Sequence, residues 1–107
     1  SVVVTNPEKT VVDCLNRPEY CGGVIEAAKA LRDGSFDYSV LSRYALDMNN
    51  SGVVRRLGFI CDYLHIPIKL PEIKTRNYLL LDPTMPGNGD TDSTWRLRVN
   101  IDLGDLE

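Results

Sequence analysis

The chain has 107 residues, of which 43% are hydrophobic and 25% are charged, and its formal net charge is −3 at pH 7. A chain of this size can bury one core but not two, and its apolar content excludes a disordered chain. No apolar run approaches the ~20 residues of a membrane span and no signal-peptide pattern is present, so we expect a soluble, cytoplasmic protein.

Residues 1–5, Ser-Val-Val-Val-Thr, are mostly β-branched and predict a strand. The chain therefore opens inside an expected strand, and it has no initiator methionine. We expect residues 1–107 to form a single domain at the C-terminal end of a longer chain, with the preceding part cut away.

The first two helices are predicted by the residues at their boundaries. Asn6 is a good N-cap and Pro7 suits the first helical position, and this helix must end before the next proline. The pair Gly22-Gly23 breaks the chain before a second helix, whose apolar and charged residues fall on opposite sides. Gly34 is expected to end that helix.

Two further helices follow along the chain. Asp37 is expected to cap the third helix and Ser51 the fourth. In the fourth helix, a turn of 100° per residue directs one apolar line toward the core. This line contains Val53, Leu57, Ile60 and Leu64, with Val54 and Cys61 beside it.

The C-terminal part of the chain is predicted to be extended. Two prolines exclude helix from residues 66–71, and residues 76–83 contain a short apolar strand. Residues 84–94 are rich in glycine and aspartate, which predicts a long surface loop. Residues 95–103 alternate apolar and polar side chains, which predicts a half-buried strand. A strand, about four helices and then strands packed against them predict the α+β class.

The outer half of the fourth helix raises a functional question. Arg55 and Asp62 lie opposite the apolar line, seven positions apart. Phe59 and Tyr63 lie on the same outer side, and Arg56 lies at its margin. Arginine and aromatic side chains are enriched at protein interfaces. This outer half therefore either forms an intermolecular surface or is covered by the C-terminal strands of the chain itself.

The cysteines offer two chemical alternatives. Cys14, Cys21 and Cys61 are an odd number without framework spacing, which suits a reducing compartment. Cys61 and His65 lie one helical turn apart and could bind zinc with the other two cysteines, but Cys14 and Cys21 are too far apart for a usual zinc knuckle. A nucleophilic cysteine would have only His65 as its base. We therefore expect core cysteines, no metal or cofactor, and no enzyme activity.

Three segments together resemble one protein family. They are NPEKTVVDCLNRPEYCGGVIEAAKAL (6–31), SGVVRRLGFICDYL (51–64) and LLLDPTMPGNGDTDSTWRLRVNIDL (79–103). Over nearly its whole length, the chain resembles the C-terminal domain of AbiEi-type antitoxins, from the AbiE toxin–antitoxin systems of abortive infection, a phage defence.

The resemblance implies a function and partners. It implies an antitoxin and transcriptional regulator whose N-terminal winged helix-turn-helix domain, missing here, binds the promoter of its own operon. The partner is a nucleotidyltransferase-like toxin, which family members are described as counteracting without a stable complex. No membrane partner is expected. The alternative function is a nucleic-acid-binding accessory domain of a transcriptional regulator, which the acidic balance of residues 86–107 opposes.

The resemblance also implies roles for single residues. Independently of the resemblance, the helical projection places Gly58 where it would permit the close approach of another element, and Asp13 is expected to pair with Arg56 if the strands cover the fourth helix. The positions with an expected structural role are Asp13, Gly22, Gly23, Gly58, Trp95 and Asn100. The candidates for a toxin- or nucleic-acid-facing surface are Arg17, Arg43, Arg55, Arg56, Phe59, Tyr63, Arg96 and Arg98.

Overall fold

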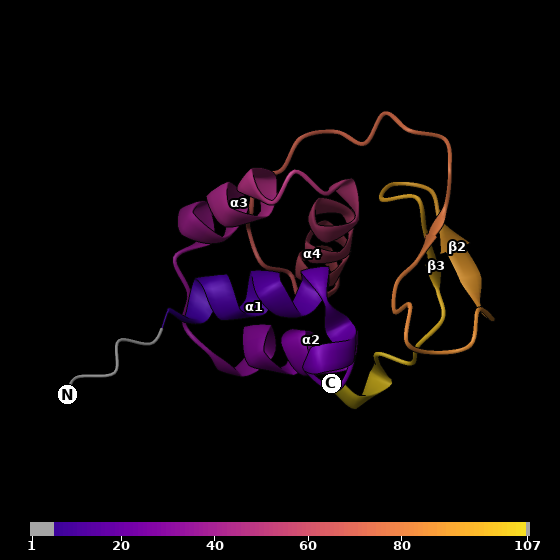
Figure 1. The fold of residues 1–107 in the computed structure, drawn as a ribbon, viewed down its shortest axis with the longest axis horizontal. Coiled ribbons are helices and arrows are strands. Elements are labelled where there is room, and N and C mark those ends of the chain that lie inside the picture. The colour runs from indigo at the N-terminus through magenta and orange to yellow at the C-terminus, as the bar shows by residue number, and fades with distance from the viewer. Residues whose placement is uncertain (1–5, 107) are drawn as a thin grey trace.

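The computed structural model describes residues 6–106 of the chain. In this part, four α-helices precede a small three-stranded sheet, so the predicted α+β class is confirmed (Figure 1). The strand expected over residues 1–5 lies outside the described residues. The elements are α1 (Pro7–Asn16), α2 (Val24–Asp33), α3 (Tyr38–Asp47), α4 (Ser51–Tyr63), β1 (Leu79–Leu80), β2 (Asp90–Asp92) and β3 (Leu97–Val99), with short 3₁₀ turns η1 (Pro18–Tyr20) and η2 (Gly104–Leu106).

Side-chain caps set the starts of three helices. Asn6 accepts a hydrogen bond from the third backbone N–H beyond it at 3.2 Å, and Asp37 caps α3 in the same way, as predicted. The cap of α4 is Asn50, so the assignment to Ser51 is wrong by one residue. The extended backbone of Asn50 brings its side-chain oxygen to 3.0 Å from the N–H of Gly52.

Two helices end on a residue other than glycine in the left-handed conformation. These residues are Asn49 after α3, with φ of 53°, and His65 after α4, with φ of 59°. The N–H of Ile66 donates to the carbonyl of Cys61 at 2.8 Å, and the N–H of His65 donates to that of Asp62 at 3.2 Å. These two bonds form a Schellman motif. The only histidine of the chain therefore terminates a helix.

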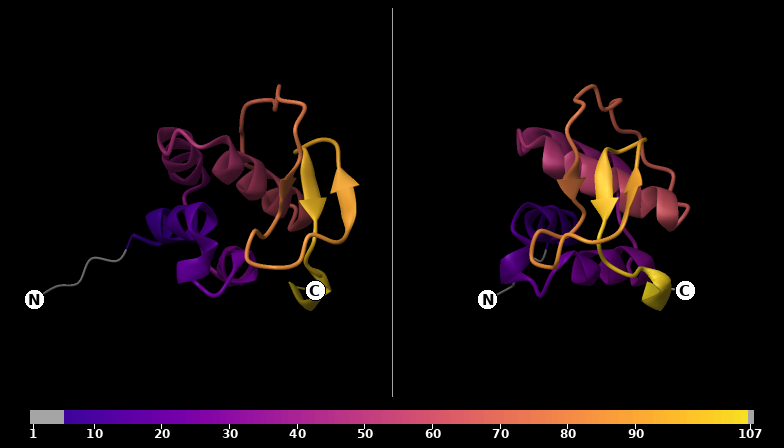
Figure 2. Two further views of the ribbon diagram at one scale, coloured as in Figure 1. Left: turned by 45° about the vertical axis from the view of Figure 1, so that its right-hand side comes forward. Right: turned by 90° about the vertical axis from the view of Figure 1, so that its right-hand side faces the viewer.

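The sheet has the strand order β1-β3-β2, with β1 parallel and β2 antiparallel to the central strand (Figure 2). The strand predicted over residues 95–103 is limited to β3, because Arg96 adopts a left-handed conformation with φ of 54° directly before it. The loop predicted over residues 84–94 contains β2 near its end. The first correction rests on a local backbone conformation and the second on pairing with β3, and alternation of apolar and polar residues reveals neither.

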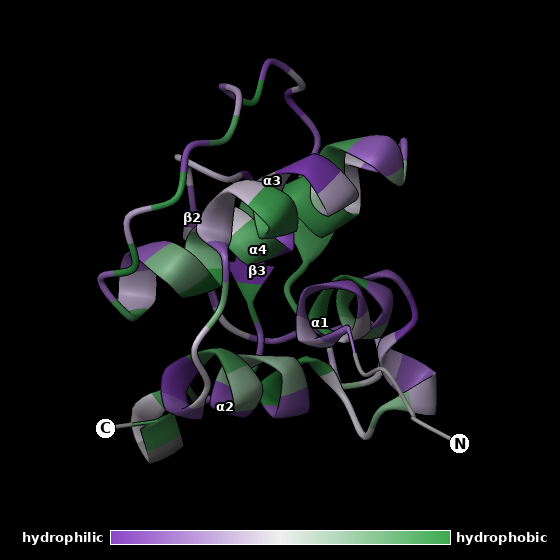
Figure 3. Ribbon diagram, turned by 90° about the vertical axis from the view of Figure 1, so that its left-hand side faces the viewer, coloured by the Kyte–Doolittle hydropathy of each residue, from purple (hydrophilic) through white to green (hydrophobic). Residues whose placement is uncertain are grey.

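One apolar core joins the helices to the C-terminal segment. The predicted inner line of α4 is confirmed, since Val53, Leu57 and Ile60 are fully buried. Leu81 and Leu97 from the sheet region are also fully buried. Green apolar stretches of the helices accordingly face the interior in Figure 3. Residues 66–78 run as an arch from α4 to β1 (Figure 1) and pack Ile66, Ile68, Leu70 and Ile73 against the core.

None of the helices in the described part of the chain has the length and the apolar character that crossing a membrane requires.

Candidate functional site

Arg55 is an internal residue, so its predicted place on an outer surface is wrong. Its side chain is 0% exposed. Its Nε donates to the carbonyl of Trp95 at 2.9 Å and its Nη2 donates to the carbonyl of Asn77 at 2.6 Å. Nη2 also donates to the carbonyl of Arg96. The guanidinium fork therefore ties α4 to the two segments that lead into the neighbouring strands β1 and β3.

Arg56 is also internal, with 8% of its side chain exposed. Its Nε donates to the carbonyls of Leu80 and Leu81, each at 3.1 Å, and its Nη2 donates to that of Leu80 at 2.9 Å. The expected pairing of Arg56 with Asp13 is wrong, because Asp13 pairs with Lys9 on its own helix at 2.9 Å. We call Arg55 and Arg56 the arginine clamp.

Both guanidinium groups of the arginine clamp are poorly hydrated. Burial lowers the pKa of Arg55, and the charge of Arg96 lowers it further. Burial also lowers the pKa of Arg56, with a contribution from Arg55 that Asp82 opposes. Backbone carbonyls rather than carboxylates accept the hydrogen bonds of the clamp. The clamp therefore depends on the position of the backbone of residues 77–96.

Gly58 and Trp95 form the second connection between α4 and the sheet region. A Cβ atom at Gly58 would overlap the indole ring of Trp95. The indole Nε1 donates to the carboxylate of Asp62 at 2.6 Å. The expected structural roles of Gly58 and Trp95, close approach and packing, are thereby confirmed.

The aromatic residues on the outer half of α4 are covered by the chain itself. Phe59 and Tyr63 are half-buried and pack against the core. The hydroxyl of Tyr63 donates to the carbonyl of Leu103 at 3.1 Å. Of the two alternatives left open by the sequence, internal coverage by the C-terminal segment is therefore the one observed.

Asp82 is a structural residue that the sequence did not reveal. It is buried, and its Oδ2 accepts from the N–H of Val24, the first residue of α2, at 3.0 Å. Its Oδ1 accepts from the N–H and the hydroxyl of Thr84, at 2.9 and 2.6 Å. The backbone N–H of Asp82 donates to Oδ1 of Asn100 at 2.9 Å, and Nδ2 of Asn100 donates to the backbone carbonyl of Asp82 at 2.7 Å. These two bonds confirm the structural role of Asn100.

Gly22 and Gly23 allow this distant cap to reach α2. Both adopt positive φ, 83° and 101°, which confirms the predicted turn. A Cβ at Gly23 would lie 2.9 Å from Oδ2 of Asp82. A helix that follows glycine has no side-chain cap of its own, and this is the signal from which a cap elsewhere in the chain could have been expected.

The most exposed aromatic residue follows α1. Tyr20 is 75% exposed, and the guanidinium carbon of Arg17 lies 5.9 Å from the centre of its ring. A pocket of about 250 Å³ beside them is lined by Asp13, Asn16, Arg17, Tyr20 and Cys21. Arg17 is one of the predicted surface residues, and Tyr20 is not among them. The 3₁₀ turn that Pro18 begins directs Tyr20 outward, which helical periodicity does not anticipate.

The other predicted surface arginines lie on separate elements. Arg43 is exposed on α3. Arg96 is half-buried and stacks on Tyr78, 5.7 Å from its ring centre, with a 3.2 Å hydrogen bond to the hydroxyl. Arg98 is half-buried and donates to the carbonyl of Gly89 at 2.9 Å. The eight predicted residues therefore do not share one surface.

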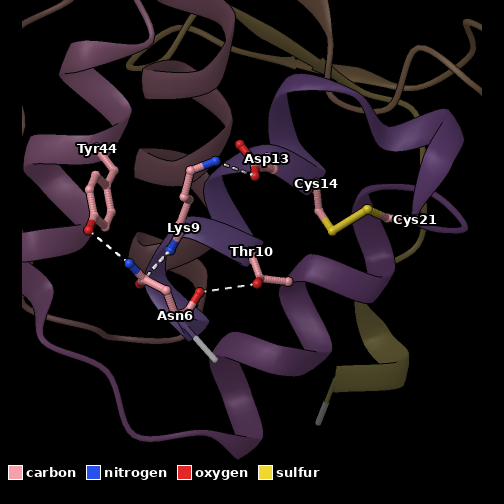
Figure 4. Close-up of polar contacts among 7 residues, drawn as sticks. All are labelled: Asn6, Lys9, Thr10, Asp13, Cys14, Cys21 and Tyr44. Atoms are coloured by element: carbon pink, nitrogen blue, oxygen red, sulfur yellow. Dashed lines mark hydrogen bonds and ion pairs between the residues drawn. A yellow bond between two sulfur atoms is a disulfide. The ribbon is translucent and has the colours of Figure 1, made fainter. Parts of the chain in front are cut away.

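Cys61 is the core cysteine that the sequence predicts, whereas Cys14 and Cys21 differ from the expectation. Cys14 and Cys21 form a disulfide with their Cα atoms 5.6 Å apart (Figure 4). The turn after α1 brings these two residues together, although their spacing follows no known framework. Cys61 is a buried free cysteine, and burial, assisted by Asp62, raises the pKa of its thiol to about 12. The zinc set with His65 is not assembled, and no group of three or more metal-ligating side chains occurs among residues 6–106.

Comparison of the chain with known protein families, curated proteins and solved structures finds no match. The resemblance to AbiEi-type antitoxins therefore stays a prediction.

Proposed function

We propose that the chain is a non-enzymatic antitoxin domain. It counteracts a nucleotidyltransferase-like toxin in the cytoplasm and supports autoregulation of its operon together with an upstream DNA-binding domain. The observation that carries the proposal is the exposed pair of Arg17 and Tyr20. A tyrosine that is mostly exposed and stacked by an arginine supplies both the apolar area and the directed donors that protein interfaces favour.

The proposal moves the toxin-facing surface away from α4. The arginine clamp, Phe59 and Tyr63 are used inside the chain, so they stabilise the domain and present little surface to a partner. Arg17 and Tyr20 extend from the turn after α1, beside a pocket that a partner side chain could enter. We assign the toxin-facing surface to these two residues.

Growth rescue tests this assignment. The toxin is expressed with the full-length protein or with residues 1–107, either unchanged or carrying Arg17→Ala and Tyr20→Ala together. We expect loss of rescue by the double variant at an unchanged thermal midpoint. The matched control, Lys74→Ala with Leu46→Ala, removes an exposed cation and an exposed apolar side chain elsewhere and should rescue fully. Full rescue by the Arg17 and Tyr20 double variant would contradict the assignment.

The alternative, a nucleic-acid-binding accessory domain, draws on the arginines outside the clamp. Arg17 and Arg43 are exposed, and Arg96 and Arg98 are half-buried. Each phosphate contact would make the slope of log affinity against log salt more negative by ~0.9 for promoter DNA. The salt dependence of promoter binding is measured for the full-length protein and for a protein that lacks residues 1–107. Equal slopes would rule this alternative out.

A further inference from the structure

The turn between α1 and α2 contains an accessible disulfide. Cys14 and Cys21 are both half-buried rather than enclosed in the core. Their bond closes the segment that includes η1 and the exposed Tyr20. In Figure 4 the disulfide lies at the end of α1, next to Asp13.

The two cysteine residues are not equally placed with respect to the nearest pocket. Cys21 lines the pocket of about 250 Å³ beside α1, together with Asp13, Asn16, Arg17 and Tyr20, whereas Cys14 is not part of this lining. A small molecule in the pocket would therefore meet Cys21 first. An attacking thiolate needs an open approach to the sulfur it attacks, so this asymmetry selects one end of the disulfide.

The charges around the pocket favour an anionic thiol. Arg17 contributes a guanidinium group that is exposed and stacked on the ring of Tyr20. The carboxylate of Asp13 also lines the pocket, but it is paired with Lys9 at 2.9 Å. Glu19 is exposed on η1 and is not part of the lining. The cation of Arg17 is therefore free to attract a carboxylate of an incoming molecule.

We propose that Cys21 is a site of reversible S-thiolation by a low-molecular-weight thiol that carries carboxylates, such as glutathione. The thiolate attacks Sγ of Cys21 and forms a new S–S bond. The bond between Cys21 and Cys14 breaks, and its electron pair leaves on Sγ of Cys14, which then takes a proton. In the reverse step, the thiolate of Cys14 attacks Sγ of Cys21 and expels the small thiol. The exchange conserves disulfide bonds and needs no separate oxidant.

Opening the disulfide changes how the turn is held. The N–H groups of Cys21 and Gly23 still donate to the carbonyl of Pro18, at 3.0 and 2.9 Å, but the covalent closure to α1 is lost. The exposed segment around Tyr20 is then held by its local backbone bonds and by the buried side chain of Pro18. This inference concerns the chemistry of the disulfide itself and does not depend on the proposed function.

The first experiment treats the folded 107-residue chain with glutathione or with cysteamine at matched thiolate concentration. Adducts are fixed by acid and located by peptide mass spectrometry. We expect the adduct on Cys21, formed at least fivefold faster by glutathione than by the cationic cysteamine. Arg17→Gln should remove most of this preference. An adduct mainly on Cys14, or no preference for glutathione, would overturn the proposal.

A second experiment separates the two cysteines. Cys14→Ser leaves the thiol of Cys21, and Cys21→Ser leaves that of Cys14. Oxidised glutathione then gives a protein mixed disulfide and one equivalent of glutathione. We expect the Cys14→Ser chain to react several times faster than the Cys21→Ser chain, while buried Cys61 stays unmodified in both. Equal rates in two folded variants would overturn the proposal.

Discussion

The indole ring of Trp95 occupies the space that a Cβ atom at Gly58 would need. This contact places the turn before β3 directly on α4, and the hydrogen bond from the indole to Asp62 fixes the ring there at 2.6 Å. The carbonyl of Trp95 accepts from Arg55 at 2.9 Å. One short segment of the C-terminal region is therefore bound to α4 by packing, by a carboxylate and by the arginine clamp.

Gly58→Ala should destabilise the fold. The added methyl group must displace the indole ring, and overpacking of this kind costs about 1 to 3 kcal/mol. Urea unfolding measures the loss. The matched control is Gly87→Ala, because the nearest side-chain atom to its new Cβ, on Leu80, is 3.3 Å away and the residue is exposed. A free energy of unfolding that is equal for both variants would contradict the role of Trp95.

Arg55→Ala should be more damaging than a surface change. The substitution leaves the carbonyls of Trp95 and Asn77 without their donor inside the protein, so we expect a loss of about 2 to 4 kcal/mol. Arg55→Lys should recover only part of the lost free energy of unfolding, because an ammonium group cannot reproduce the fork of donors. Arg43→Ala, at an exposed arginine on α3, should change the free energy of unfolding by less than about 0.5 kcal/mol.

Asp82→Ala should loosen the start of α2. The N–H of Val24 would lose its acceptor, and loss of a helix cap costs about 1 to 2 kcal/mol. Amide hydrogen exchange is expected to accelerate in the first turn of α2 and in the loop around Thr84, because Asp82 serves both. Asp47→Ala, at an exposed aspartate, is the control. Acceleration spread evenly over all helices would indicate general unfolding instead of a lost cap.

His65→Gly should stabilise the protein. For a residue with a Cβ, the left-handed conformation of residue 65 costs about 1 to 2 kcal/mol of stability, which glycine avoids. Glycine also has more conformational freedom in the unfolded chain, and this offsets about half of the gain. We expect a net gain of about 0.5 to 1 kcal/mol in thermal or urea unfolding. Asn49→Gly should gain less, because asparagine tolerates this conformation better. A loss on His65→Gly would show that the imidazole makes a contribution beyond ending α4.

Local features of this fold could be predicted from the sequence and distant contacts could not. The caps Asn6 and Asp37 and the buried line of α4 depend on neighbours within one or two helical turns, and these predictions are confirmed. The burial of Arg55 depends on carbonyls more than 20 positions away. A helical projection places this side chain outside because it shows polarity and angle, but not what packs on the helix. The contact between Asp82 and Val24 could not be predicted for the same reason, because the two residues are 58 positions apart in the sequence.

The buried thiol of Cys61 gives a pH-dependent prediction. Its pKa is about 12 in the folded chain and near 9.0 for an exposed thiol. Between these values the unfolded chain loses this proton while the folded chain keeps it, so the free energy of unfolding falls as the pH rises above 9. Below pH 9 the group has no such effect, because both states are protonated.

Urea unfolding of the unchanged chain and of Cys61→Ala, from pH 8 to 10.5, isolates this contribution. All other ionisable groups are common to both chains, so only the difference between the two slopes reports on Cys61. The unchanged chain should lose stability more steeply above pH 9, by up to about 1.4 kcal/mol per pH unit. Iodoacetamide should alkylate Cys61 in the native chain only as fast as the fold opens and exposes this thiol, even at pH 9.5. Parallel slopes together with rapid alkylation would mean that this thiol is exposed to solvent and ionises normally.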